Sequence, residues 1–322
     1  MISIFTSTDA PEQILADDRV LAMVEFSTQA AAQGDDPRHI RTPLHGPAAQ
    51  FEVWRGESVA ELGRHGNISY VRNAELTIGQ MRLADDGTDI SALSAHAYQE
   101  LLAWLASQKH SHLWRLWNVL ADINHGDGDD ERYRAFCTGR HQAFSAAGYT
   151  PDQYPAASAI GGSCPELFIM FVAGPGAGLQ VENPRQTHAY RYPRQYGPRS
   201  PSFARASLMP RNGSAVGRLL VSGTASVVGH QSRHEHDWRA QLDETRKNLL
   251  ALLHGAGAEA APEILRLYHR DSIDPAVAIE LCQQYWGAEV SILPIRGEIC
   301  RRELLLEIEG VWPVAGPGAT PT

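Results

Sequence analysis

Two halves of the chain predict the same order of secondary-structure elements. In the first half, strands rich in β-branched and aromatic residues alternate with two helical patterns as strand, strand, helix, strand, helix, strand, strand. The second half repeats this order, from FARASLMP at residues 203–210 to ELLLEIEGVW at residues 303–312. The central strands match in sequence, LWRLW at residues 113–117 and ILRLY at residues 264–268. The repeat predicts an α+β protein of two fused β-β-α-β-α-β-β units, each a mixed sheet with its helices on one face.

The repeat also suggests how the chain is divided. We expect an N-terminal α+β unit at residues 1–183, a linker at 184–205 and a C-terminal α+β unit at 206–322. Residues 1–45 show no regular pattern and predict irregular structure. The linker is rich in proline and has little periodicity, and a segment this long without regular structure is usually either disordered or functional. We expect it to line the active site.

Charge and cysteine usage limit the possible partners. The formal net charge of −9 disfavours nucleic acid and anionic membranes. The N-terminus lacks the basic region of a signal peptide, and no apolar run reaches the ~20 residues of a membrane span. The four cysteines include no C-x-x-C pair, so reduced thiols in the cytoplasm are the simplest interpretation.

The linker concentrates cations in this acidic chain. Between residues 185 and 205 it carries no acid, but it has three tyrosines and five arginines: Tyr190, Tyr192, Tyr196, Arg185, Arg191, Arg194, Arg199 and Arg205. Guanidinium groups bind carboxylates or phosphates in a bidentate way, and tyrosines can cover a small organic ring. The alternative is a solvated loop whose arginines pair with surface acids. We favour the anion site, because prolines and aromatic residues suit a shaped pocket.

The C-terminal segment ICRRELLLEIEG, residues 299–310, combines an apolar strand pattern with carboxylates. In a strand, Glu303, Glu307 and Glu309 share one face. The pattern alone favours an edge strand with one wet face. The other interpretation is that one carboxyl is half-buried, so that desolvation raises its pKa and makes it a general acid. Arg301 would then bind an anionic substrate.

Three further stretches contain residue types that occur in binding or metal sites. The small residues of SGTAS, Gly223 and Ala225 among them, would let a ligand approach the backbone, although tight packing explains them equally well. Arg140 lies in the less polar part of a helix and could project inward. His234 and His236 do not share a helix face, so we expect no metal site.

Several longer motifs carry a family resemblance, which covers residues 132 to 310. They are FCTGR, YPAASAIGG, VENPRQTHAYRYPRQYGPRSPSFARA, VSGTASVVGH and ICRRELLLEIE. In these motifs the chain resembles the chorismatases, which cleave chorismate and release pyruvate. The last strand is also similar to the end of the reactive-intermediate (enamine/imine) deaminase fold. Chorismatases resemble two such units fused in one chain, in agreement with the repeat.

The resemblance implies roles for particular residues. Glu307 matches the catalytic glutamate, a general acid that protonates the enol-ether methylene of chorismate. Tyr192 and Arg205 fall in the substrate site, with Gly223 and Ala225 of SGTAS beside it and Arg140 and Arg301 as further carboxylate partners. Cys300 and Gly223 match the pattern of members that form 3-hydroxybenzoate, whereas hydrolytic members carry alanine at both places. The chemistry implies no metal and no organic cofactor.

The expected activity is therefore conversion of chorismate to 3-hydroxybenzoate, with or without some 4-hydroxybenzoate, and pyruvate. Three alternatives stay open: hydrolysis to a dihydroxycyclohexadiene carboxylate, deamination of enamines or imines, and binding of an aromatic acid without turnover. Fold alone does not decide among them. We expect chorismate as the small-molecule partner, no nucleic-acid or membrane partner, and a monomer, because an internal repeat can replace associated subunits.

Overall fold

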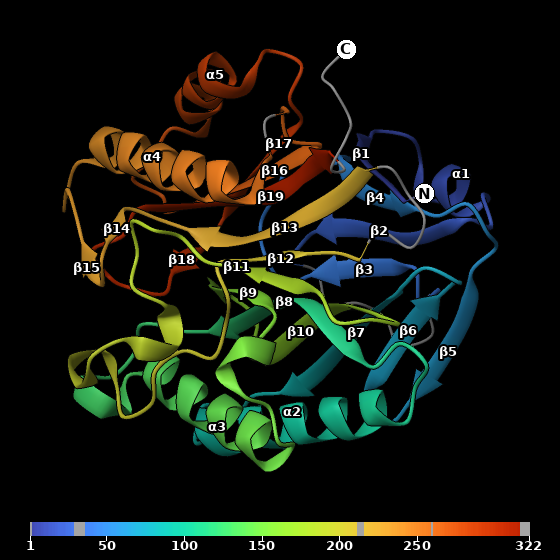
Figure 1. Cartoon of the computed structure of the whole chain (residues 1–322), viewed down its shortest axis with the longest axis horizontal. Coiled ribbons are helices and arrows are strands. Elements are labelled where there is room, and N and C mark those ends of the chain that lie inside the picture. Colours follow the sequence, from blue (N-terminus) through green and yellow to red (C-terminus); the bar gives the residue numbers. More distant parts are fainter. Residues whose placement is uncertain (1, 29–35, 211–215, 259, 316–322) are drawn as a thin grey trace.

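Three β-sheets form the centre of the protein. The computed structural model describes residues 2–28, 36–210, 216–258 and 260–315 (Figure 1). A four-stranded sheet has the order β1-β4-β2-β3, a seven-stranded sheet β18-β9-β8-β10-β7-β6-β5, and a six-stranded sheet β11-β12-β13-β19-β16-β17. Among the described residues, no helix has both the length and the apolar character needed to cross a membrane.

The first half of the chain supplies the following elements: β1 (Ser3–Ser7), α1 (Pro11–Leu15), β2 (Val20–Phe26), β3 (His39–Thr42), β4 (Phe51–Arg55), β5 (Glu61–His65), β6 (Ile68–Arg72), β7 (Thr77–Ala84), α2 (Ile90–Ala106), β8 (His112–Ala121), α3 (Arg132–Ala146), β9 (Ala156–Gly162), β10 (Glu166–Gly174) and β11 (Leu179–Val181). The second half supplies β12 (Ala206–Leu208), β13 (Val216–Thr224), β14 (Val227–Val228), β15 (Gln231–Ser232), α4 (Trp238–Ala256), β16 (Ile264–His269), α5 (Pro275–Trp286), β17 (Ile292–Arg296), β18 (Glu298–Ile299) and β19 (Leu306–Ala315).

The two units share not only the order of their elements along the chain but also the order of the strands in their sheets. The first half contains the neighbours β6-β7-β10-β8-β9, and the second contains β12-β13-β19-β16-β17. In each unit a helix connects one parallel pair, β8 with β9 or β16 with β17, and the other neighbours are antiparallel. The predicted α+β fold of two fused β-β-α-β-α-β-β units is confirmed.

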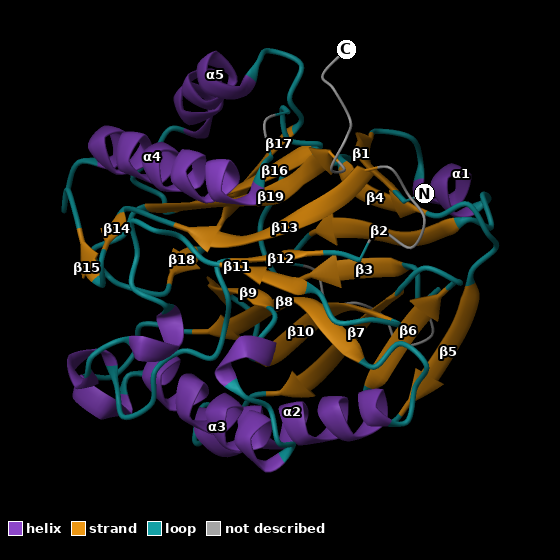
Figure 2. Cartoon of the chain, viewed as in Figure 1, coloured by secondary structure: helices purple, strands orange, loops and turns teal. Residues whose placement is uncertain are grey.

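The helices cover only the outer faces of the two units (Figure 2). On α2, the buried residues Tyr98, Leu101, Leu102 and Leu105 follow the three- and four-residue spacing of one helix face. They pack in one apolar cluster with residues of the seven-stranded sheet, and α4 does the same with the six-stranded sheet. The inner faces of all three sheets share a separate core, which includes Trp54, Trp117 and Leu220. Side chains from three sheets therefore meet at the centre of the molecule.

The N-terminal segment differs from the expectation of irregular structure. Its strands β1 to β4 form the four-stranded sheet, and β4, which we expected in the first repeated unit, belongs to it. The central strand β2 has the sequence VLAMVEF and is buried almost throughout. A strand covered on both faces has no polar alternation, which is why its pattern was not recognised.

The last strand also starts later than predicted. Residues 301–303 form a turn, and β19 begins at Leu306, so Glu303 is not on the face of β19 that carries Glu307 and Glu309. Two short strands connect the units: β11, from the first segment, pairs with β12, and β18, from the second, pairs with β9. The division at residues 183 and 205 stays a prediction.

Candidate active site

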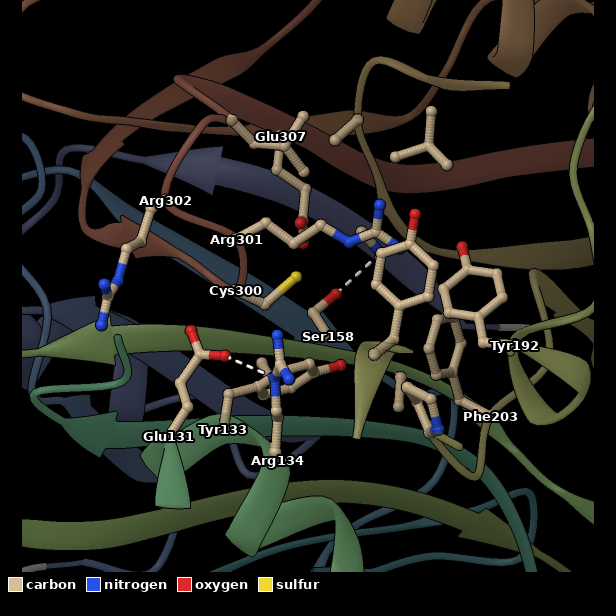
Figure 3. A pocket seen from close by; sticks show the side chains of 18 of the residues that line it. Glu131, Tyr133, Arg134, Ser158, Tyr192, Phe203, Cys300, Arg301, Arg302 and Glu307 are labelled. Atoms are coloured by element: carbon tan, nitrogen blue, oxygen red, sulfur yellow. Dashed lines mark hydrogen bonds and ion pairs between the residues drawn. The ribbon is translucent and has the colours of Figure 1, made fainter. Parts of the chain in front are cut away.

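A cavity of about 240 Å³ lies where the two repeated units and the linker meet (Figure 3). Strand β9 contributes Ser158, β13 contributes Gly223, and β19 contributes Glu307. The two units are joined here by hydrogen bonds, because Ala157 N–H donates to Ser222 Oγ at 2.9 Å and Gly223 N–H donates to Ser158 Oγ at 2.8 Å. All eight residues predicted for the site line this one cavity: Arg140, Tyr192, Arg205, Gly223, Ala225, Cys300, Arg301 and Glu307.

Glu307 is a buried carboxyl at the floor of the cavity. Its side chain points toward Ser158 and Cys300 (Figure 3), and the residue is only 5% exposed. Burial raises its pKa to about 8, and the neighbouring Glu309 carboxylate adds to the rise, against the opposing charges of Arg115 and Arg205. The carboxyl is therefore protonated at neutral pH and able to donate a proton. The alternative of a wet strand face is wrong, because both Glu307 and Glu309 are buried.

Glu309 lies on the same face of β19 as Glu307, but its pKa is shifted in the opposite direction. Burial disfavours its charge, but Arg115, Arg266 and hydrogen bonds from Ser158 and Tyr268 hold its pKa below the usual range. Its Oε1 accepts from Trp117 Nε1 at 2.6 Å, Tyr268 Oη at 2.8 Å and Arg266 Nη1 at 3.1 Å. Arg115 and Ser158 donate to Oε2. The environment therefore raises the pKa of one carboxyl and lowers that of its neighbour. Such a pair is typical of active sites in which the carboxyl with the raised pKa acts as an acid.

Gly223 gives the Glu307 carboxyl its space. A Cβ at this position would stand 1.7 Å from Glu307 Oε1 and 2.9 Å from Ser158 Oγ. Any larger residue must therefore displace the carboxyl. Of the two interpretations of SGTAS, tight packing applies at Gly223, where the Glu307 side chain occupies the space, and the approach of a ligand to this backbone stays a prediction.

Two buried arginines supply positive charge to the cavity. Arg205 is 4% exposed and donates from Nη2 to Thr187 O at 2.9 Å and to Tyr192 Oη at 2.7 Å. Arg140 is 2% exposed and donates to Ser202 O at 2.9 Å. The Nε atoms of both are buried without a hydrogen-bond partner. A buried cation with a free donor is expected to bind an anion.

The wall of the cavity is aromatic and cationic. The Arg301 guanidinium lies 4.1 Å from the Tyr196 ring centroid and 5.1 Å from that of Tyr192, and donates to His230 O at 2.9 Å. Burial, and to a lesser degree the charge of Glu307, raises the pKa of the Cys300 thiol. Cys300 therefore stays a neutral thiol, which excludes a thiolate nucleophile and leaves it as a small wall of the cavity beside Glu307.

The linker lines the cavity, but most of its arginines do not. Arg205 is the one linker arginine on the cavity wall, together with Tyr192 and Tyr196. Arg191, Arg194 and Arg199 are exposed, and Arg185 binds Glu244. The predicted cations outside the linker, Arg140 and Arg301, come from α3 and from the turn before β19. Counting charges in a loop does not show which of them face inward.

Several residues of the site escaped sequence reasoning. Ser158 lay inside the motif YPAASAIGG without being singled out, and Tyr133, Arg134 and Gln186 also line the cavity. Figure 3 shows Tyr133 and Arg134 on the α3 side, facing Glu307 across the cavity. Arg115 had a usable signal, because an arginine between apolar residues in LWRLW is costly to bury unless it is paired. Within the described ranges, no group of three His, Cys, Asp or Glu side chains is placed to hold a metal ion.

Comparisons with known proteins find relatives both by sequence and by structure. Residues 52–173 match the family model described as "Chorismatase FkbO/Hyg5-like, N-terminal". The chain is 34% identical to a 3-hydroxybenzoate synthase of Streptomyces hygroscopicus, over 81% of this chain and 80% of that protein. It is 31% identical to a chorismatase of Streptomyces rapamycinicus, over 92% and 93%. A crystal structure of a chorismatase covers 97% of this chain and 98% of its own, with a TM-score of 0.85 and 27% identity.

Proposed function

The chain belongs to the chorismatase family, and from this premise we propose that it converts chorismate to 3-hydroxybenzoate and pyruvate. The proposal rests on one arrangement of charged side chains in the cavity. A buried, protonated Glu307 and two buried arginines, Arg140 and Arg205, line one cavity that is sized for a small molecule. Chorismate is a dicarboxylate with an acid-labile enol ether, so it presents the charges that these arginines would bind and the bond that the acid would break.

The proposed reaction begins with proton transfer from the Glu307 carboxyl to the enol-ether methylene carbon. The ring hydroxyl then attacks the neighbouring ether carbon as the bond from that carbon to the ether oxygen breaks, so pyruvate leaves, the hydroxyl loses its proton and an arene oxide forms. The arene oxide opens at the carbon that first carried the hydroxyl, its oxygen takes up a proton, and the former ether carbon loses its ring proton, which gives aromatic 3-hydroxybenzoate. Substrate and products together contain the same atoms, so the reaction consumes neither water nor oxidant. Arg205 with Tyr192 would hold one carboxylate and Arg140 or Arg301 the other, which fixes the methylene beside the acid.

Two residues support the aromatic product over hydrolysis. Cys300 and Gly223 stand where the family resemblance places the residues of 3-hydroxybenzoate-forming members, and both touch the space around Glu307. The relative at 34% identity is named a 3-hydroxybenzoate synthase. Deamination of enamines or imines is disfavoured, because it assigns no role to the buried arginines and tyrosines of the cavity.

The test is incubation of the purified protein with chorismate, without added metal and with a chelator in a parallel sample. We expect pyruvate in a coupled lactate dehydrogenase assay, 3-hydroxybenzoate as the main ring product in chromatography, and no change with the chelator. A non-aromatic diol in equal amount to pyruvate would assign the hydrolytic reaction. Product binding without pyruvate release would indicate a binding protein.

The pH dependence of turnover follows from the raised pKa of Glu307. As a general acid it works in its protonated form, so activity is present below its pKa of about 8 and is lost as the pH rises through that value. We expect kcat/KM to fall tenfold per pH unit on this alkaline limb. An alkaline limb below pH 6 would contradict the assignment, because an ordinary exposed glutamate would then be the titrating group.

Replacing Gly223 by alanine tests the close approach to Glu307. The added Cβ would lie 1.7 Å from Glu307 Oε1, so the carboxyl must move. We expect kcat to fall at least tenfold and the diol fraction to rise, because a displaced acid and a reshaped cavity admit water. Chromatography of the ring products measures this, and Gly255→Ala, at a helical glycine with open space around it, is the matched control.

We propose further that the enzyme is a cytoplasmic monomer. Residues of both repeated units and of the linker line the cavity, so the internal repeat can replace associated subunits, and the cysteines of the described part are free thiols. Light scattering coupled to size exclusion measures the mass directly, and a dimer that persists at nanomolar concentration would contradict the monomer.

A further inference from the structure

The four-stranded N-terminal sheet reaches the catalytic acid through a chain of buried charges. Glu52, on β4, is 1% exposed and accepts two hydrogen bonds from Arg266, at 2.7 Å from Nε and 2.8 Å from Nη2. The Nη1 of the same guanidinium donates to Glu309 Oε1 at 3.1 Å. Arg266 thus joins a carboxylate of the N-terminal sheet to the carboxylate two residues from Glu307. Two sheets contribute to this chain, the four-stranded sheet through Glu52 and the six-stranded sheet through Arg266 and Glu309, and the mechanism described above does not use it.

Hydrogen bonds from two neighbouring side chains, Trp54 and Arg266, hold the Glu52 carboxylate in one position. Trp54 Nε1 donates to its Oε1 at 2.7 Å, and the Arg266 guanidinium lies 4.7 Å from the Trp117 ring centroid. Glu52 and Arg266 do not line the main cavity, so neither is positioned to touch the substrate. Buried ion pairs are weak evidence for stability, because well-packed apolar residues often serve as well or better. A functional role is therefore worth testing.

We propose that Glu52 is a positioning residue: through Arg266 it fixes Glu309 as the carboxylate that keeps Glu307 in its acid form. This inference rests on the proposed function, in which Glu307 donates the proton. The N-terminal sheet is then part of the catalytic machinery and not only a covering of the core.

The direction of the effect follows from the charges that surround the pair. Glu307 faces Glu309 on its own strand, Arg115 on β8, Arg205 before β12, and the neutral thiol of Cys300. Glu309 faces Arg115, and Arg266 and Tyr268 on β16. Without the Glu52 charge, Arg266 neutralises Glu309 more fully. The electrostatic potential at Glu307 then becomes more positive. This favours the ionised carboxylate and lowers the pKa of Glu307.

The experiment is the pH profile of kcat/KM for Glu52→Gln against the wild-type protein. We expect the alkaline limb to move to lower pH by roughly one unit, the scale of a unit charge acting across a buried site. Turnover at pH 6, where both proteins carry the protonated acid, should change less than threefold. A loss of thermal stability with an unmoved limb would overturn the inference and leave Glu52 a purely structural residue.

A second variant keeps the test decisive if Glu52→Gln folds poorly. Glu52→Gln with Arg266→Met removes both charges of the outer pair, and the cation removed is the one nearer to Glu309. The limb should then move to a pH above that of the single variant, or above the wild-type value if the single variant is lost. An unmoved limb would overturn the inference. Asp85→Asn is the matched control, because Asp85 is equally buried and paired with Arg132 but contacts neither glutamate.

Failure of this inference is distinguishable from failure of the proposed function. Infrared difference spectra between acid and alkaline pH, with Glu307→Gln as reference, report the carboxyl proton of Glu307 without turnover. If Glu307 titrates in the spectra and Glu52→Gln does not shift it, the link through Arg266 is wrong and the acid stands. If Glu307→Gln retains turnover, the acid assignment itself is wrong.

Discussion

Glu307→Gln should lower kcat by about a thousandfold or more and leave chorismate binding nearly unchanged. The amide has the size of the protonated carboxyl but has no acidic proton to give, and a positioned general acid contributes about 10²–10⁴-fold. Stopped assays with excess enzyme measure the residual rate, and calorimetry with chorismate measures binding. Because protonated glutamate and glutamine are both neutral, the fold should persist, which thermal denaturation checks.

A rate within tenfold of wild type would remove Glu307 from the mechanism. Glu280→Gln, at an exposed position on α5, provides the matched control for the same chemical change away from the site. It should have wild-type kcat, KM and pH profile.

Arg205→Gln should weaken chorismate binding by about 30- to 5000-fold, with a smaller loss of kcat. The arginine is buried, donates to Tyr192 and lines the cavity. Truncating one partner of a buried charged contact costs about 2–5 kcal/mol. Direct binding to the inactive Glu307→Gln background measures this loss without turnover.

Arg191→Gln is the control for Arg205, because Arg191 belongs to the same linker but its side chain is exposed. It should leave binding unchanged within twofold. Equal losses in the two variants would mean that general positive charge of the linker attracts the dianion, and that no particular arginine holds it.

Much of the fold was accessible from local pattern. Strands and helices of the two units have clear periods, and caps mark the helices: Asp89 accepts from Ala92 N–H before α2, and Asp237 from Ala240 N–H before α4. The strand β2 was missed because burial on both faces removes the polar alternation that identifies a strand. Its sheet depends on contacts distant in sequence, such as the pairing of β1 with β4.

Some features of the site can also be predicted from the sequence, and others cannot. Glu307 and Arg205 were found because the family resemblance names them, and composition would have ranked the exposed Arg191 equally with Arg205. The electrostatic difference between Glu307 and Glu309 is invisible in the sequence EIE. It arises from residues on three other strands, since Arg115, Ser158 and Arg266 all reach Glu309 and none donates to Glu307.

The duplicated topology has an evolutionary consequence. Arg115 lies opposite Val172 and Arg266 opposite Glu309; one step along, Trp117 lies opposite Met170 and Tyr268 opposite Glu307. The first unit therefore has apolar residues where the second has both glutamates. In an assembly of identical subunits every mutation appears in every copy, so each copy must retain the same residues. Encoding both units in one chain removes that symmetry, so the second unit can carry both glutamates while the first contributes Ser158 and Arg140 to the same cavity and keeps apolar residues at the matching strand positions.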